Sequence, residues 1–138
     1  MGEICFGCFS QLAKGGACPH CGYDPGEDIG KYPSALSAGT ILNGKYILGR
    51  VLGQGGFGIT YAAQDFSSKQ RVAIKEFLPT AIASREATGH VSSFGSQHEN
   101  FEHGKEGFME EANALVDFKN NPHIVSVFDL FEANGTVY

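Results

Sequence analysis

Three glycines between two apolar runs constrain the fold of this chain more than any other feature. Gly53, Gly55 and Gly58 form a GxGxxG pattern, and glycine lets a backbone adopt positive φ and pass close to phosphate oxygens. A dinucleotide-binding fold would need a helix directly after these glycines. Here the residues 59–62 read Ile-Thr-Tyr-Ala, and β-branched and aromatic residues favour a strand. The glycines therefore predict the turn of a β-hairpin.

The strands of this hairpin are predicted over 46–52 and 59–65. Turn-forming residues at 67–70 lead into a third predicted strand, 71–76, which contains Val72-Ala73-Ile74-Lys75. The order of glycine turn, second strand and VAIK strand resembles the nucleotide-binding lobe of a protein kinase. The combined motifs resemble most closely a Ser/Thr protein kinase of the bacterial, eukaryotic-like type.

The resemblance covers residues 45–138 and implies an α+β fold, an antiparallel five-stranded sheet with one long helix. It implies that Leu52 forms the roof of an adenine pocket, that Ala73 packs on the adenine ring, and that Lys75 binds the α- and β-phosphates of ATP. Thr60 stands where the family has valine and keeps the β-branch. The implied ATP-binding residues are Leu52, Gly53, Gln54, Gly55, Gly56, Phe57, Gly58, Thr60, Ala73 and Lys75.

A lysine in such a site needs a carboxylate partner to stay charged and oriented. In kinases a glutamate on the following helix has this role, and residues 108–115 resemble that helix. Glu110 and Glu111 are adjacent, so only one can face the sheet. We assign the role to Glu111, four residues before Leu115, and expect Glu110 to be solvated. Lys75 and Glu111 are thus the implied catalytic residues.

The segment 77–95 is longer than a minimal kinase lobe needs, and it predicts a loop with a short hairpin. Ser96-x-x-Glu99 resembles a capping box that starts the helix. Residues 121–125, Asn-Pro-His-Ile-Val, resemble the start of the fourth kinase strand, which we expect to continue to 131. Asn134-Gly135 predicts a hairpin turn before a fifth strand over 136–138.

The kinase elements that follow the fifth strand, the catalytic loop and the DFG motif among them, are not in this sequence. They supply the base and the Mg²⁺ sites of phosphoryl transfer, so we expect no catalysis by this chain alone. For the complete kinase the resemblance implies ATP with Mg²⁺ and a protein substrate. The alternative is a non-catalytic interaction or scaffold protein. The retained glycines with Lys75 and Glu111 favour the kinase.

All four cysteines lie near the start of the chain, in two CxxC pairs: Cys5, Cys8, Cys18 and Cys21. Four thiolates at such spacing can hold Zn²⁺ tetrahedrally, which predicts a zinc ribbon over 1–26. Two alternatives stay open. Cys-Pro-His-Cys is also a disulfide-oxidoreductase tetrad, but that chemistry needs a surrounding βαβ framework, and disulfides need an oxidising compartment. Zinc is the favoured interpretation, with a protein partner for the ribbon and no ligand role for His20.

Turn-forming residues dominate 27–44 and predict a linker between the ribbon and the lobe, 45–138. The net charge of −5 argues against nucleic acid as a partner. No apolar run is long enough to span a membrane, and the N-terminus lacks the regions of a signal peptide. We therefore expect a cytoplasmic protein.

Overall fold

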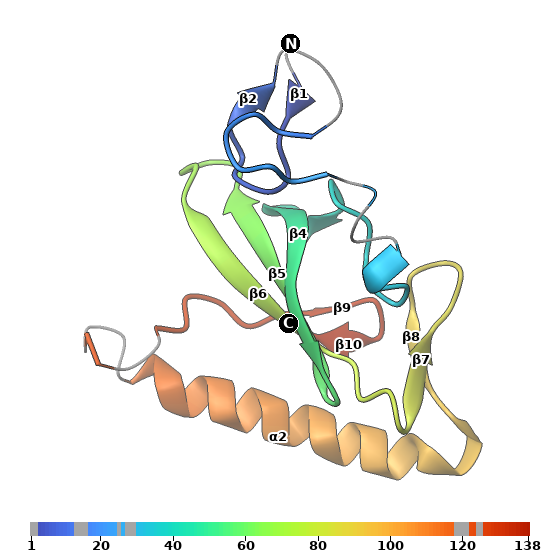
Figure 1. Cartoon of the computed structure of the whole chain (residues 1–138). Helices are drawn as coiled ribbons and strands as arrows, with labels where there is room; N and C mark the ends of the chain where they lie inside the picture. The colour runs from blue at the N-terminus through green and yellow to red at the C-terminus, as the bar shows by residue number, and fades with distance from the viewer. Residues whose placement is uncertain (1–2, 13–16, 25, 27–29, 118–121, 124–125) are drawn as a thin grey trace. The chain divides into compact units, whose positions relative to one another are not determined.

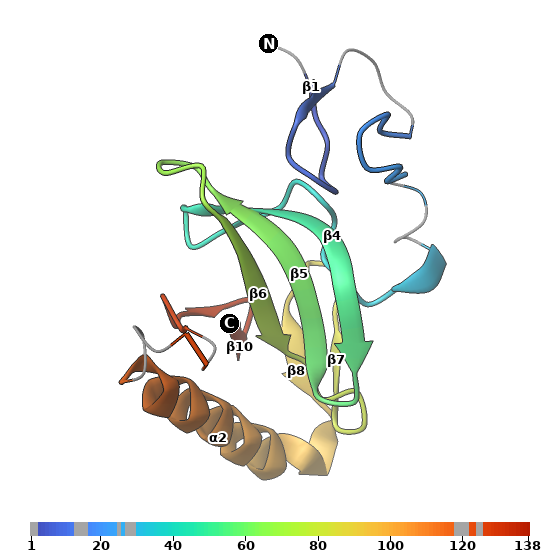
Figure 2. The same cartoon turned by 60° about the vertical axis from the view of Figure 1, so that its left-hand side comes forward.

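The computed structural model of the chain describes residues 3–12, 17–24, 26, 30–117, 122–123 and 126–138. They form two compact units, one of residues 1–55 with 59–75 and the other of 56–58 with 76–138. Their elements, drawn in Figures 1 and 2, are β1 (Glu3–Ile4), β2 (Gln11–Leu12), β3 (Ile41–Leu42), β4 (Tyr46–Gly55), β5 (Gly58–Asp65), β6 (Arg71–Phe77), β7 (Ala83–Arg85), β8 (Val91–Ser93), the 3₁₀ helix η1 (Gly95–Gln97), α2 (His98–Val116), β9 (Glu132–Ala133) and β10 (Thr136–Val137). Within these described ranges no helix is long and apolar enough to cross a membrane.

The main sheet has the strand order β3-β4-β5-β6. Strands β4, β5 and β6 confirm the three strands predicted around the glycines, each extended by one to three residues at the glycine turn or beyond Glu76. In β5 the side chains of Ile59, Tyr61 and Ala63 are fully buried, and the residues between them are partly exposed. This period of two is the reason the sequence folds as a strand with one covered face.

The predicted linker follows the outer edge of β4. Ile41 pairs with Ile47 in register, the Leu48 N–H donates to the Thr40 carbonyl at 2.8 Å, and the Gly39 N–H donates to the Leu48 carbonyl at 2.8 Å. These bonds occupy backbone groups that an edge strand would otherwise expose.

The predicted hairpin in the segment 77–95 is present as β7 and β8, paired from Ala83↔Ser93 to Arg85↔Val91. A second hairpin, β9–β10, turns through Asn134 and Gly135, both with positive φ (53° and 74°). Asparagine and glycine tolerate this conformation, as the sequence predicts. The Val91 N–H donates to the Asn134 carbonyl at 2.7 Å, which joins the two hairpins.

The long helix α2 begins at His98, directly after η1. The predicted capping box is not formed, because Gln97 is the N-cap residue and makes no side-chain capping bond. The helix continues through its glycines and packs on Phe77, whose ring centroid lies 5.5 Å from that of Phe101 and 5.7 Å from that of Phe108. An added Cβ at Gly104 would lie 2.8 Å from Cζ of Phe77, so this glycine makes room for the ring.

The fourth strand expected up to residue 131 is not formed by the described part of that stretch, 126–131. Phe128 and Asp129 are both exposed, and two adjacent exposed residues break the alternation of a half-buried strand. Phe131 and Tyr138 instead exchange backbone hydrogen bonds of 3.1 and 2.9 Å that extend the β9–β10 hairpin. The α+β class and the single long helix are confirmed. In the described residues, a four-stranded sheet and a separate hairpin replace the expected five-stranded sheet.

Candidate functional site

Strand β6 presents Ala73 and Lys75 on its exposed face. Both residues are exposed, whereas Ile74 and Glu76 between and after them are buried. Successive side chains of a strand point to opposite faces, so Ala73 and Lys75 lie on the same, exposed face of β6. On the neighbouring strands of the same unit, Leu52 is 52% exposed and Thr60 is partly exposed. The residues expected to contact adenine are therefore accessible.

The glycine turn between β4 and β5 is open around most of its backbone. A Cβ added to Gly53, Gly55 or Gly56 would meet no atom within 4 Å, and none of the three has positive φ. These glycines are therefore not required by an unusual backbone conformation, and their surroundings leave room for another group to come close. Phe57 at the tip has a side chain 75% exposed, and Gln54 is exposed as well.

Gly58 differs from the other glycines of the pattern. A Cβ at this position would lie 1.9 Å from the backbone oxygen of Glu76, so only glycine allows the start of β5 to approach β6 so closely. The sequence suggested a phosphate-binding role for Gly58. Its packing against Glu76 is a second requirement that the pattern alone did not reveal.

The helix α2 carries both candidate glutamates, and Glu110 and Glu111 are both exposed. One side of the helix is covered, since Phe101 is buried and Phe108 and Leu115 are partly buried. Lys75 belongs to the first unit and Glu111 to the second. The ion pair between them stays a prediction.

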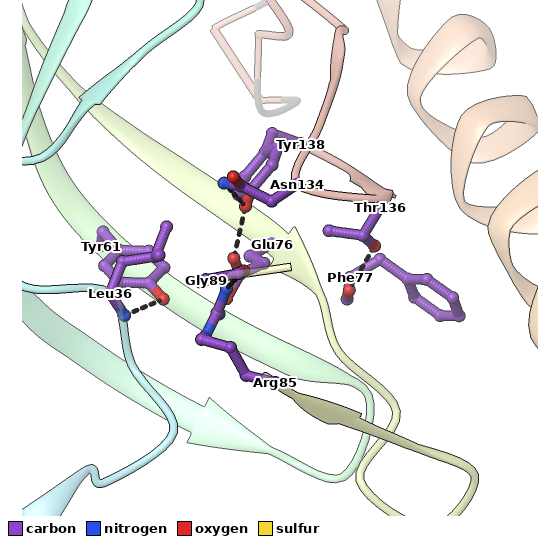
Figure 3. A network of polar contacts seen from close by, with 9 residues as sticks. All are labelled: Leu36, Tyr61, Glu76, Phe77, Arg85, Gly89, Asn134, Thr136 and Tyr138. Atoms are coloured by element: carbon purple, nitrogen blue, oxygen red, sulfur yellow. Dashed lines mark hydrogen bonds and ion pairs between the residues drawn. The ribbon is translucent and has the colours of Figure 1, made fainter. Parts of the chain in front are cut away.

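A buried polar network that the sequence reasoning missed surrounds the residue after Lys75 (Figure 3). The side chain of Glu76 is fully buried and forms an ion pair with Arg85 of β7. The Tyr138 hydroxyl donates to Oε2 of Glu76 at 2.6 Å, and the Asn134 side-chain amide donates to that hydroxyl at 2.9 Å. Nη1 of Arg85 donates to the Gly89 carbonyl at 2.8 Å.

Both oxygens of the Glu76 carboxylate have a partner in this network, Arg85 at Oε1 and the Tyr138 hydroxyl at Oε2. Burial and the charge of Glu76 raise the pKa of Tyr138 well above its usual value, so the hydroxyl keeps its proton and remains a donor. A signal for the network was present in the sequence. Alternation along β6 places Glu76 on the covered face, and a buried carboxylate requires a cationic or hydrogen-bonding partner.

The four cysteines form one cluster in the first unit, with all Sγ atoms within 4.8 Å of one another. Sγ of Cys5 lies 3.6 Å from that of Cys21, and Sγ of Cys8 lies 3.9 Å from that of Cys18. A tetrahedral site with Zn–S bonds of about 2.3 Å requires sulfur separations of roughly 3.8 Å. The thiols are all free, and their spacing fits a single metal ion such as zinc.

Backbone and hydroxyl groups favour the thiolate form of two of the four cysteines, Cys8 and Cys18, because their hydrogen bonds lower the pKa of both thiols. The Gly7 N–H points to Sγ of Cys5 at 3.2 Å and the His20 N–H to Sγ of Cys18 at 3.3 Å. Hydrogen bonds from the hydroxyl and the backbone of Ser10 lower the pKa of Cys8 to about 6. Such bonds orient metal-binding thiolates and reduce their protonation. His20 is exposed and outside the cluster, as expected.

The ribbon is packed against β4 within the same compact unit. The Arg50 N–H donates to the Phe6 carbonyl at 2.7 Å. This bond lies on the same edge of β4 as those between Leu48 and the linker, two residues further along the strand. A Cβ at Gly49 would lie 2.2 Å from the Phe6 carbonyl oxygen and 2.7 Å from Cζ of Phe9. The cysteine-containing loop thus packs closely on two glycines, Gly49 of β4 and Gly39 beside the Phe6 ring.

Comparison with known proteins identifies the lobe. The chain is 33% identical over 99 residues to CBL-interacting protein kinase 22 of Oryza sativa subsp. japonica, covering 71% of this chain and 21% of that protein. It superposes on the solved structure of PpkA-294 in its apo form with a TM-score of 0.72 and 32% identity, covering 75% of this chain and 37% of that one. The chain contains a protein-kinase N-terminal lobe.

This kinase lobe spans only about a fifth of the plant relative and little over a third of PpkA-294. No family model matches the chain. The two kinase comparisons cover 71% and 75% of the chain, and the four cysteines near its start fit a zinc site by their own geometry.

Proposed function

We propose that the lobe binds ATP and belongs to a Ser/Thr protein kinase. The observation that carries this proposal is the exposed face of β6, where Ala73 and Lys75 are accessible, in a sheet whose glycine turn has open space around its backbone. A cation presented from a strand and approachable backbone N–H groups are the groups that bind phosphates in kinases.

In this proposal the adenine ring lies between Leu52 and Ala73, and the ammonium of Lys75 binds the α- and β-phosphates. The glycine turn covers the phosphates, and the exposed ring of Phe57 shields them from water. Glu111 orients Lys75 by an ion pair. Together these groups position ATP, and the ammonium of Lys75 balances part of its negative charge; positioning and charge balance are most of what a protein contributes to phosphoryl transfer.

The complete protein would transfer the γ-phosphoryl group to a serine or threonine hydroxyl of a protein substrate. Mg²⁺, bound outside this chain, would neutralise charge on the phosphates. The base that accepts the hydroxyl proton would also come from residues outside the chain.

We infer that the cysteine cluster holds Zn²⁺ in a structural role. Four thiolates close the coordination sphere and leave no position for a substrate. The sulfur separations of 3.6 and 3.9 Å support this assignment, as do the N–H groups directed at the sulfurs. A ribbon of this size depends on its metal for folding, and its surface is the proposed contact for a protein partner.

Calorimetric titration of the full-length protein with a non-hydrolysable ATP analogue and Mg²⁺ tests the nucleotide site. The variant is Lys75→Met, and the matched control is Lys69→Met, which removes the same charge from the exposed turn between β5 and β6. We expect micromolar affinity in the wild type and in the control, and at least a tenfold loss, roughly the value of one charge-assisted contact, in Lys75→Met. No heat of binding in the wild type would favour the scaffold alternative.

A further inference from the structure

Two backbone hydrogen bonds attach the tip of the glycine turn to the segment that follows β6. The Leu78 N–H donates to the Phe57 carbonyl at 2.9 Å, and the Thr80 N–H donates to the Gly56 carbonyl at 3.3 Å. Leu78 is buried. The turn tip and the segment 78–80 belong to the same compact unit, so the position of the tip depends on where that segment lies.

The segment 78–80 is in turn held at both ends. At its start, Gly58 brings β5 against the Glu76 carbonyl, and the Thr136 hydroxyl donates to the Phe77 carbonyl at 2.5 Å. After it, the chain enters the β7–β8 hairpin, whose Arg85 side chain returns to the carboxylate of Glu76. The ion pair between Glu76 and Arg85 thus closes the loop of chain that contains 78–80.

Arg85 is suited to this task because its guanidinium makes two separate contacts. One nitrogen bonds to Glu76 and the other to the carbonyl of Gly89 in the β7–β8 turn. The side chain is nearly buried, at 10% exposed. A planar guanidinium can bridge two acceptors at fixed angles, whereas an ammonium on a flexible stem cannot reproduce that geometry.

We propose that Arg85 is a positioning residue for nucleotide binding: through Glu76 it fixes the segment 78–80, which holds the glycine turn by its carbonyls at 56 and 57. This proposal rests on the proposed function and names a determinant of its affinity outside the glycine and lysine motifs. A turn already held in place loses less conformational freedom when it closes on phosphates, and affinity rises accordingly.

The test compares Arg85→Lys with Arg71→Lys in the full-length protein. Both keep the positive charge, and Arg71 is an exposed residue at the other end of β6, so it is the matched control. For Arg85→Lys we expect the Kd of the ATP analogue to rise about tenfold, the effect of losing one charge-assisted hydrogen bond. In the complete kinase, with its own catalytic loop and a protein substrate, KM for ATP should rise while kcat changes by less than about twofold.

Hydrogen exchange distinguishes positioning from general destabilisation. In Arg85→Lys, amides in a peptide covering 77–81 should exchange about tenfold faster, and those in a peptide covering 46–52 should keep the wild-type rate. Equal acceleration of both peptides would show a merely structural role and overturn the proposal. The proposal would also be overturned if Arg85→Lys bound the ATP analogue with the wild-type Kd while Lys75→Met lost affinity as expected. That result would leave the proposed nucleotide site intact. If Lys75→Met itself bound as wild type, the proposed function would fail first.

Discussion

Replacing Gly49 with alanine should separate the ribbon from β4. The new Cβ would lie 2.2 Å from the Phe6 backbone oxygen, about 1 Å inside ordinary contact distance, and a backbone atom cannot rotate away as the end of a side chain can. Relief requires the ribbon loop to move, which breaks the bond from the Arg50 N–H to that oxygen.

The size of the effect follows from these contacts. Overpacking of this kind costs about 1–3 kcal/mol, and losing the hydrogen bond costs about 0.5–1.5 kcal/mol. Alanine recovers about 0.5–1 kcal/mol relative to glycine in a strand. The net expectation is a loss of about 0.5–4 kcal/mol in the free energy of unfolding, a fall in Tm of roughly 2–16 °C for a chain of this size.

Thermal unfolding followed by circular dichroism measures this change, with and without a zinc chelator. Gly53→Ala is the matched control, because it lies on the same strand and its Cβ would meet nothing within 4 Å. The chelator should lower the Tm of the wild type and the control, but it should affect Gly49→Ala much less, since the ribbon is already detached. If Gly49→Ala and Gly53→Ala unfold alike, the ribbon does not pack on β4 as described.

Three further expectations concern the metal, the helix and the buried network. The purified protein should contain one zinc ion per chain, for the single cysteine cluster, and Cys8→Ala should lower the metal content measured by mass spectrometry; metal-free wild type would contradict this. Gly107→Ala should raise stability by about 1 kcal/mol, because its Cβ is unobstructed, whereas Gly104→Ala should be neutral or destabilising because of Phe77; equal shifts in urea unfolding would show that the ring is not packed there. Tyr138→Phe should cost about 1–3 kcal/mol at neutral pH. The pKa of Tyr138 is raised on folding, so the hydroxyl contributes its full stability below the unfolded pKa near 10 and less above it. The difference in free energy of unfolding between wild type and Tyr138→Phe, measured in urea, should therefore become smaller at alkaline pH. A difference that does not change with pH would be evidence against the buried hydroxyl.

The central part of the lobe could be predicted from the sequence because its signals are local. β-branched and aromatic residues after Gly58 excluded a helix directly after the glycines, and the apolar run before Lys75 predicted the strand that carries it. Asn134-Gly135 specified its turn for the same reason, since few residues tolerate its φ values. The cysteine spacing was also sufficient to predict the cluster.

The remaining features depend on contacts between distant residues. The pairing of Glu76 with Arg85 joins residues on different strands, and the contact of Phe6 with Arg50 joins residues 44 positions apart. The alternation along β6 could have indicated that Glu76 is buried, but not that Arg85 is the cation that it meets. The expected fourth strand was wrong for 126–131 because its apolar residues suit a strand locally, while the backbone of Phe131 pairs with that of Tyr138.

Backbone NMR of the full-length protein during titration with the non-hydrolysable ATP analogue and Mg²⁺ tests the nucleotide site most directly. We expect the largest chemical-shift changes at the amides of the glycine turn, 53–58, and on β6 at Ala73 and Lys75, with none in β1 and β2. Shifts confined to other parts of the chain, or no shifts at millimolar analogue, would contradict the account of this lobe as an ATP-binding surface.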